Sequence, residues 1–175
     1  GSRDEARGRA AADALGIPRA YGSYEALLAD PEIEAIYNPL PNHLHVPLTL
    51  QAAAAGKHVL CEKPIALTAD EATQLRAAAG KVLIAEAFMV RFHPQWLRAR
   101  DLVREGRIGT LRAVQMFFGY NNLDPANVRN KADIGGGGLY DIGCYAIVAG
   151  RFFLGAEPVR GIALIDRDPV FRTDR

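Results

Sequence analysis

A lysine between a glutamate and a proline is the first residue of this chain whose setting suggests chemistry. Lys63 follows a short apolar run that begins at His58 and is typical of a buried strand. Ligands of open α/β sheets bind at the carboxyl ends of the strands, and Pro64 restricts Lys63 to extended backbone, which fixes the direction of its side chain. An ammonium group there could donate to a substrate oxygen or lower the pKa of a neighbouring acid. The alternative interpretation is a solvated lysine in a turn.

A second candidate is a glycine-rich entry into a predicted helix, where four glycines at positions 135–138 precede Asp141 and Tyr145. The glycines would allow the backbone to approach a ligand closely. Asp141 and Tyr145 are four residues apart and therefore share one helical face. The acid and the phenol could orient and protonate a substrate oxygen, with a nearby ammonium lowering the tyrosine pKa from about 10. The alternative is a core tyrosine above a glycine surface that serves helix packing.

Two loops that follow predicted strands could line a ligand. The first, residues 38–45, reads Asn-Pro-Leu-Pro-Asn-His-Leu-His, so its prolines stiffen the backbone while Asn42 and His45 offer polar contacts. The second carries Arg91, which could reach an anionic or polyhydroxyl ligand. The aromatic residues around Arg91 are equally consistent with core packing between two units.

A metal site is a further alternative, because His43, His45, His58 and Cys61 are all suitable ligands. However, His43 and His45 are only two positions apart and His58 opens a separate strand, so their side chains would point in different directions. We therefore expect no metal, and keep a metal-dependent enzyme built on His43, His45 and Cys61 as a third hypothesis.

The elements that would position these motifs alternate between helix and strand up to residue 106. The predicted helices cover residues 4–15, 23–29, 46–55, 69–79 and 94–105, and the predicted strands cover residues 34–38, 58–61 and 82–88. Thr68 and Glu71 have the spacing of a capping box at the start of the fourth helix. Strands separated by helices of about ten residues indicate βαβ units and a parallel sheet.

The pattern changes after residue 106, where a second unit begins. Residues 110–120 and 159–166 read as strands, and residues 135–154 as the single helix between them. We therefore divide the chain into residues 1–106 and residues 107–175, with an α+β arrangement in the second part.

Composition limits the class of protein. Of the 175 residues, 49% are apolar and 23% are charged, and the net charge is +1. These values indicate a globular domain, exclude disorder, and provide no electrostatic basis for binding nucleic acid or an anionic membrane. No run is long and apolar enough for a membrane span, and the two cysteines fit a reducing, cytoplasmic compartment. A small-molecule site is the remaining possibility.

In their order along the chain, these motifs resemble those of the Gfo/Idh/MocA oxidoreductases, in particular the branch of glucose–fructose oxidoreductase and of dihydrodiol or xylose dehydrogenase. The resemblance runs from Ser2-Arg3-Asp4 through the segments 38–45, 62–64 and 88–94 to residues 141–145. It implies a partial Rossmann-type parallel sheet, followed by an α+β domain with an open, mostly antiparallel sheet. It also implies hydride transfer between NAD(P) and a sugar or diol, in a dimer or tetramer formed through the second sheet.

The resemblance further implies roles for individual residues. Lys63 would contact the reacting oxygen, Asp141 would bind substrate, and Tyr145 would be the acid/base, a place where many members have histidine. The residues expected to contact the cofactor are Ser2, Arg3, Asn38, Pro39, Leu40, Asn42, His45, Glu62, Lys63 and Arg91. Ser2 and Arg3 would end the second Rossmann strand and hold the 2′-phosphate, which favours NADP over NAD.

Family members place a first strand and a Gly-x-Gly-x-x-Gly turn before the position of Gly1, and further strands after residue 174. That turn holds the pyrophosphate at a helix N-terminus. The resemblance thus predicts a chain that is incomplete at both ends. It leaves open the alternative of a non-catalytic fragment that is stable only through association with itself or with another subunit.

Overall fold

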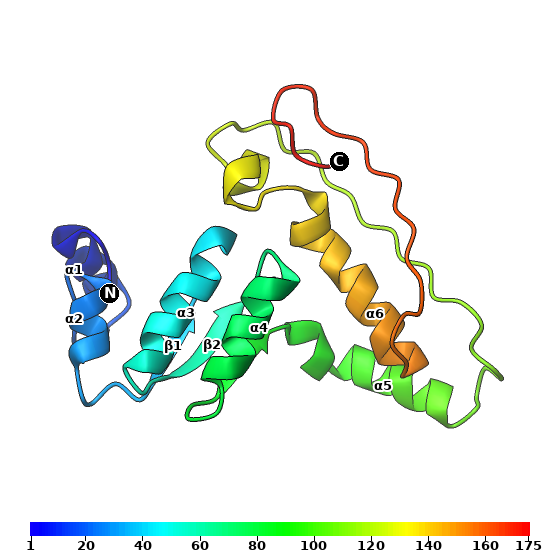
Figure 1. Cartoon of the computed structure of the whole chain (residues 1–175), viewed down its shortest axis with the longest axis horizontal. Coiled ribbons are helices and arrows are strands. Elements are labelled where there is room, and N and C mark those ends of the chain that lie inside the picture. Colours follow the sequence, from blue (N-terminus) through cyan, green and yellow to red (C-terminus); the bar gives the residue numbers. More distant parts are fainter.

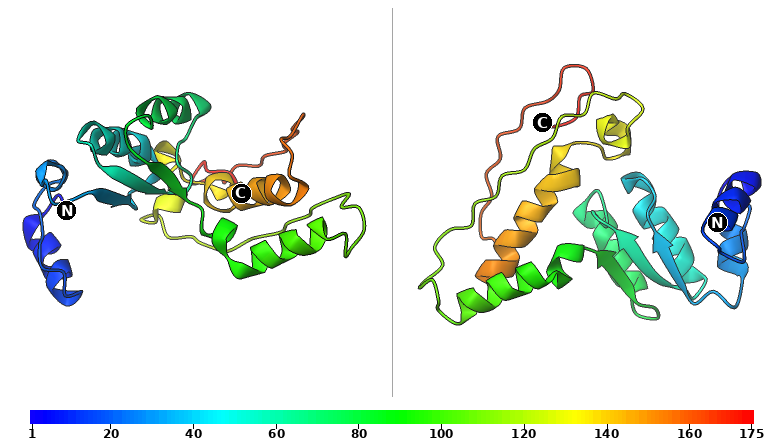
Figure 2. Two further views of the ribbon diagram at one scale, coloured as in Figure 1. Left: turned by 90° about the horizontal axis from the view of Figure 1, so that it is seen from below. Right: turned by 180° about the vertical axis from the view of Figure 1, so that it is seen from behind.

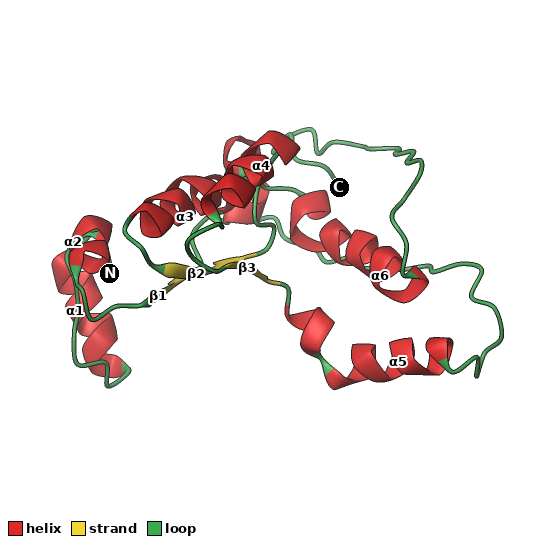
Figure 3. Ribbon diagram, turned by 60° about the horizontal axis from the view of Figure 1, so that its bottom comes forward, coloured by secondary structure: helices red, strands yellow, loops and turns green.

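The computed structural model describes all 175 residues, and its centre is a small parallel sheet. The sheet has the order β1-β2-β3, with all strands parallel. Its strands are β1 (Ala35–Asn38), β2 (His58–Glu62) and β3 (Ile84–Ala87). The crossover helices α3 (His45–Ala54) and α4 (Ala69–Ala78) lie together on one side of it, as Figure 3 shows. The predicted βαβ organisation is therefore confirmed.

The core of this first part lies between the sheet and α3. Val59 and Cys61 of β2 are buried, and they pack with Ala52 of α3. The intervening Leu60 points to the opposite face and is 45% exposed, because successive strand residues alternate between faces. Helix α3 ends before Gly56, whose φ of 76° is one that glycine adopts without strain.

Side-chain caps begin the helices at the predicted places. Asp4 accepts a hydrogen bond at the start of α1 (Glu5–Ala14), and Ser23 does so at the start of α2 (Tyr24–Ala29). The Thr68 hydroxyl accepts from the backbone N–H of Glu71 and caps α4. Helices α1 and α2 lie beyond β1, at the opposite end of the molecule from the helices of residues 94–104 and 144–154 (Figure 1).

Two helices pack against each other at the junction of the two parts. Helix α5 (Pro94–Arg104) lies at the end of the first part and α6 (Cys144–Leu154) in the second, and Figure 2 shows them from below and from behind. Trp96 of α5 packs against Phe152 and Phe153 of α6, with ring centroids 5.7 and 5.3 Å apart. A π-helical turn, residues Leu139–Gly143, leads directly into α6. None of the helices combines the length and the apolar character that crossing a bilayer requires.

The structure differs from the sequence-based prediction in four places. Residues 110–120 and 159–166 form no strand, and both are loops in Figure 3. A strand needs a neighbour for its backbone N–H and C=O groups, and the only pairing here is an isolated bridge between Arg167 and Asp174. Ser2 and Arg3 likewise precede α1 without joining the sheet. The predicted helix 135–154 starts only at Leu139, after Gly135 and Gly137 with φ of 83° and 116°.

Candidate active site

Two cavities meet between the two parts of the chain. The first, of about 290 Å³, lies between the carboxyl ends of β1 and β2 and the glycine-rich segment. The second, of about 730 Å³, has mostly apolar walls that include Met89, Trp96 and Phe118. Three charged residues line both cavities: Lys63, Arg129 and Asp141. Ligands in the two cavities would therefore meet at these side chains.

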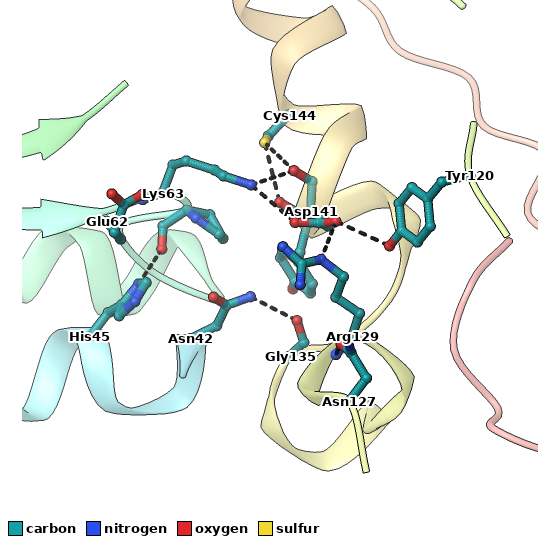
Figure 4. Close-up of polar contacts among 12 residues, drawn as sticks. Asn42, His45, Glu62, Lys63, Tyr120, Asn127, Arg129, Gly135, Asp141 and Cys144 are labelled. Carbon is teal, nitrogen blue, oxygen red and sulfur yellow. Dashed lines mark hydrogen bonds and ion pairs between the residues drawn. The ribbon is translucent and has the colours of Figure 1, made fainter. Parts of the chain in front are cut away.

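Lys63 and Asp141 form an ion pair at this junction (Figure 4). Lys63 Nζ lies 3.1 Å from Asp141 Oδ1 and also donates to the backbone carbonyl of Asp141. Both side chains are only 16% exposed. The structure thus joins the lysine at the end of β2 to the acid before α6.

The other carboxylate oxygen of Asp141 accepts hydrogen bonds from two residues that the sequence analysis missed. Arg129 donates through Nε at 2.7 Å, and the Tyr120 hydroxyl donates at 3.0 Å. Burial raises the pKa of Asp141, but the hydrogen bonds and charges of Arg129 and Lys63 outweigh burial and hold it below its ordinary value. Asp141 is therefore an ionised anchor and not a proton donor.

Tyr145 lines the second cavity beside Lys63. Its ring centroid lies 5.1 Å from Lys63 Nζ, and its edge-to-face contact with Phe88 has a centroid distance of 4.9 Å. No group of the chain hydrogen-bonds to the hydroxyl of Tyr145, so this hydroxyl is available to a ligand. Burial raises the pKa of Tyr145 and the charge of Lys63 lowers it by less, so the net shift is upward. The predicted lowering of the Tyr145 pKa is therefore wrong, because the burial of the phenol has a larger effect than the charge of Lys63.

The loop 38–45 is held by its own polar residues. His45 is 1% exposed, and its Nδ1 and Nε2 lie 2.7 Å from the carbonyl oxygens of Pro64 and Leu40. Asn38 is also buried and donates to the backbone carbonyl of His45. Asn42 Nδ2 donates to the carbonyl oxygen of Gly135 at 2.8 Å. These contacts connect the loop, the Glu-Lys-Pro segment and the glycine-rich segment into one wall.

The structure brings most of the predicted cofactor contacts to the first cavity. Its lining includes Pro39, Leu40, Asn42, His45, Glu62 and Lys63. Asn38 points into the protein instead, and exposed Arg91 lines neither cavity. Ser2 and Arg3 lie beside α1, at the other end of the chain's long axis from α6 (Figure 1). Their roles, like the other predicted roles, remain predictions.

The glycine-rich segment is shaped by close packing within the protein. A Cβ on Gly137 would lie 2.0 Å from Asp174 Oδ1, and one on Gly136 would lie 2.6 Å from the carbonyl oxygens of Arg129 and Lys131. The Asp174 carboxylate accepts from the backbone N–H of Leu139, at the start of the helical turn that carries Asp141. These glycines therefore fix the position of Asp141.

Two of the three donors in the metal-based hypothesis, His45 and Cys61, are poorly suited to bind a metal ion. Both ring nitrogens of His45 face carbonyl oxygens, and burial raises the pKa of Cys61 to about 11, which keeps the thiol protonated. Protonated thiols are poor metal ligands. No three His, Cys, Asp or Glu side chains of the chain lie close enough together to hold a metal ion.

Comparison with known proteins defines the class. Residues 1–84 match the model of the oxidoreductase family with an NAD-binding Rossmann fold, GFO/IDH/MocA, and residues 96–174 match the GFO/IDH/MocA C-terminal domain. The chain therefore belongs to the Gfo/Idh/MocA oxidoreductase family, as the sequence motifs indicated.

Individual relatives agree with this assignment. The chain is 55% identical to the uncharacterised oxidoreductase ORF334 of Rhizobium meliloti over 99% of its length and 53% of the relative. It is 49% identical to D-xylose 1-dehydrogenase (NADP(+)) 2 of Haloferax volcanii over 88% of its length and 48% of the relative. The chain spans about half the length of these curated relatives.

A solved structure is similar as well. The 3-ketoreductase KijD10 of Actinomadura kijaniata, in complex with NADP and TDP-benzene, superposes with a TM-score of 0.81 at 37% identity. The match covers 87% of this chain and 47% of that protein.

Proposed function

We propose that the full-length protein is an NAD(P)-dependent oxidoreductase that transfers hydride between nicotinamide and a sugar or diol. The observation that carries this proposal is the meeting of Lys63, Asp141 and Tyr145 where the two cavities join. The second cavity combines apolar walls with polar groups at one end, which suits a carbon skeleton bearing hydroxyls. The xylose dehydrogenase among the relatives supports the same substrate class.

The first cavity, of about 290 Å³, suits the nicotinamide end of a dinucleotide. It lies at the carboxyl ends of two parallel strands, where such cofactors bind, and Asn42, Glu62 and Lys63 give its lining polar groups. Pro39, Leu40, Asn42 and His45 would line the cofactor on one side, and Glu62 on another. When bound, the nicotinamide would accept or supply the hydride. The match of residues 1–84 to an NAD-binding family supports this placement.

We assign the 2′-phosphate of NADP to Ser2 and Arg3. Arg3 is exposed, and its guanidinium group has no partner in the protein. A guanidinium group binds phosphate through two parallel hydrogen bonds. NADP in the complex of KijD10 and in the name of the xylose dehydrogenase supports NADP over NAD.

Three residues of the chain would each have a role at the reacting oxygen of the substrate. Lys63 donates a hydrogen bond to the reacting oxygen, and Asp141 fixes the lysine and contacts the substrate. The Tyr145 hydroxyl exchanges a proton with that oxygen. Because its pKa is raised, Tyr145 holds its proton at neutral pH and can protonate a substrate carbonyl in the reducing direction. In the oxidising direction its proton would first pass to solvent, and the tyrosinate beside Lys63 would then accept the proton of the substrate hydroxyl.

We also propose an assembly for the complete protein. Residues 1–106 form the dinucleotide-binding domain, and residues 107–175 begin the substrate and oligomerisation domain. Segments 110–120 and 159–166 would become strands of an open, mostly antiparallel sheet, through which copies associate. Exposed apolar side chains support this: Phe117 is 96% exposed and Leu164 100%. Two free cysteines are consistent with a cytoplasmic location.

The function is tested with Lys63→Ala and Tyr145→Phe in the full-length protein. Each removes a group at the reacting oxygen, so we expect turnover to fall at least about a hundredfold. NADPH binding, followed by fluorescence titration, should change little, because most of the proposed cofactor contacts remain. Unchanged turnover in both variants would refute the assignment.

A further inference from the structure

Arg129 occupies the junction of the two cavities but has no role in the reaction proposed so far. It lies on the short helix η3 (Val128–Asn130), whose first turn is capped by Asn127. Its Nε is committed to Asp141, at 2.7 Å. Its two terminal nitrogens have no hydrogen-bond partner in the protein, and the side chain is 46% exposed.

The free edge of this guanidinium group faces the site. Arg129 lines both cavities, and Figure 4 shows its guanidinium between Asp141 and the wall that carries Asn42. Two cations, Lys63 and Arg129, share the single carboxylate of Asp141, which leaves one positive charge unbalanced among these three. Such a group attracts a ligand oxygen that can accept two hydrogen bonds or carry negative charge.

The shared carboxylate also sets the spacing of the two cations. Lys63 Nζ lies 3.1 Å from Oδ1 and Arg129 Nε lies 2.7 Å from Oδ2 of the same residue. Their donor groups are therefore neighbours. A substrate whose reacting oxygen is held by Lys63 would bring the oxygen of the adjacent carbon towards Arg129.

We propose that Arg129 is a substrate-binding, specificity-determining residue that holds the oxygen on the carbon next to the reacting carbon. The inference rests on the proposed function. It narrows the substrate to compounds with vicinal oxygens, a hydroxyl or carbonyl beside the one that is oxidised or reduced. An Arg129 that only positions Asp141 would affect all substrates alike, and this difference is measurable.

The test compares matched substrates with the full-length protein and NADP⁺. One pair is D-glucose and 2-deoxy-D-glucose, and the other is trans-cyclohexane-1,2-diol and cyclohexanol; the second member of each lacks the neighbouring hydroxyl. A hydrogen bond to a charged group contributes enough that wild type should prefer the first member about ten- to a hundredfold in kcat/KM. In Arg129→Gln this ratio should fall towards one. Arg129→Lys, which keeps the charge and loses the planar fork, should retain part of the preference.

Lys131→Gln is the matched control, because it removes a positive charge from the same loop and its exposed side chain touches neither cavity. Its substrate ratio should equal that of wild type. The assignment would be overturned if Arg129→Gln lowered kcat/KM equally for both members of a pair, so that their ratio stayed as in wild type. The proposed function would then remain intact. Should Arg129→Gln fail to fold, Arg129→Lys decides by the same ratio. No turnover of any of the four compounds by wild type would instead contradict the proposed function and remove the basis of this inference.

Discussion

At the scale of single residues, the site is organised around the carboxylate of Asp141. It accepts hydrogen bonds from the side chains of Lys63, Arg129 and Tyr120, which come from three separate segments. Of these partners, the sequence pointed only to Lys63, because its motif is local. Arg129 and Tyr120 lie in segments with no local pattern of their own, and only the fold brings them to Asp141.

The ionised state of Asp141 predicts a dependence of stability on pH. Its folded pKa lies below the ordinary value of 3.8, so ionisation stabilises the fold above that value, and the contribution disappears as pH falls through the lower, folded pKa. Asp141→Asn should therefore lose more unfolding free energy, relative to wild type, at pH 7 than near pH 3. Urea unfolding of the full-length proteins at both pH values measures this.

A matched control is Asp133→Asn, which changes an exposed carboxylate nearby that makes no ion pair. The free energy of unfolding of Asp133→Asn should differ little from that of wild type at either pH. A penalty for Asp141→Asn that is the same at pH 7 and pH 3 would show that its charge does not stabilise the folded state.

At the scale of elements, apolar runs and capping residues were sufficient to predict the helices and strands of the parallel-sheet part. The Thr68 cap and the three parallel strands lie where apolar runs and capping residues predicted them. Segments 110–120 and 159–166 have strand-like patterns, but a pattern does not supply a partner, and neither segment is paired as a strand. The late start of the helix at Leu139 depends on Asp174, a contact between distant positions that periodicity does not reveal.

Gly137 tests how tightly that helix start is packed. It has a φ of 116°, and a Cβ would lie 2.0 Å from Asp174 Oδ1, so Gly137→Ala should lower the free energy of unfolding by about 1–3 kcal/mol. Denaturant unfolding of the full-length protein provides the value.

Gly80→Ala is the matched control, since nothing lies within 4 Å of the added methyl group and its φ is not positive. It should change stability by no more than about 0.5 kcal/mol. Equal stabilities of Gly137→Ala and Gly80→Ala would mean that the glycine-rich segment does not need its close contact with Asp174.

At the scale of the whole molecule, the site exists only because two differently built parts meet. The parallel sheet supplies Lys63 at the end of β2, and the helical part supplies Asp141 and Tyr145 at the start of α6. Asn42 and His45 hold the wall between them through carbonyl contacts. Motifs that are distant in the sequence thus surround one space, which is the spatial basis of the proposed hydride transfer.

The most direct test of this claim is isotope transfer in the full-length protein. D-Xylose or D-glucose carrying deuterium on every carbon is incubated with NADP⁺, and the reduced cofactor is analysed by mass spectrometry. The account predicts deuterium in the reduced cofactor with wild type and a loss of this product in Lys63→Ala. Reduced cofactor without deuterium, or no reduction at all by a wild-type protein that binds NADP⁺, would contradict it.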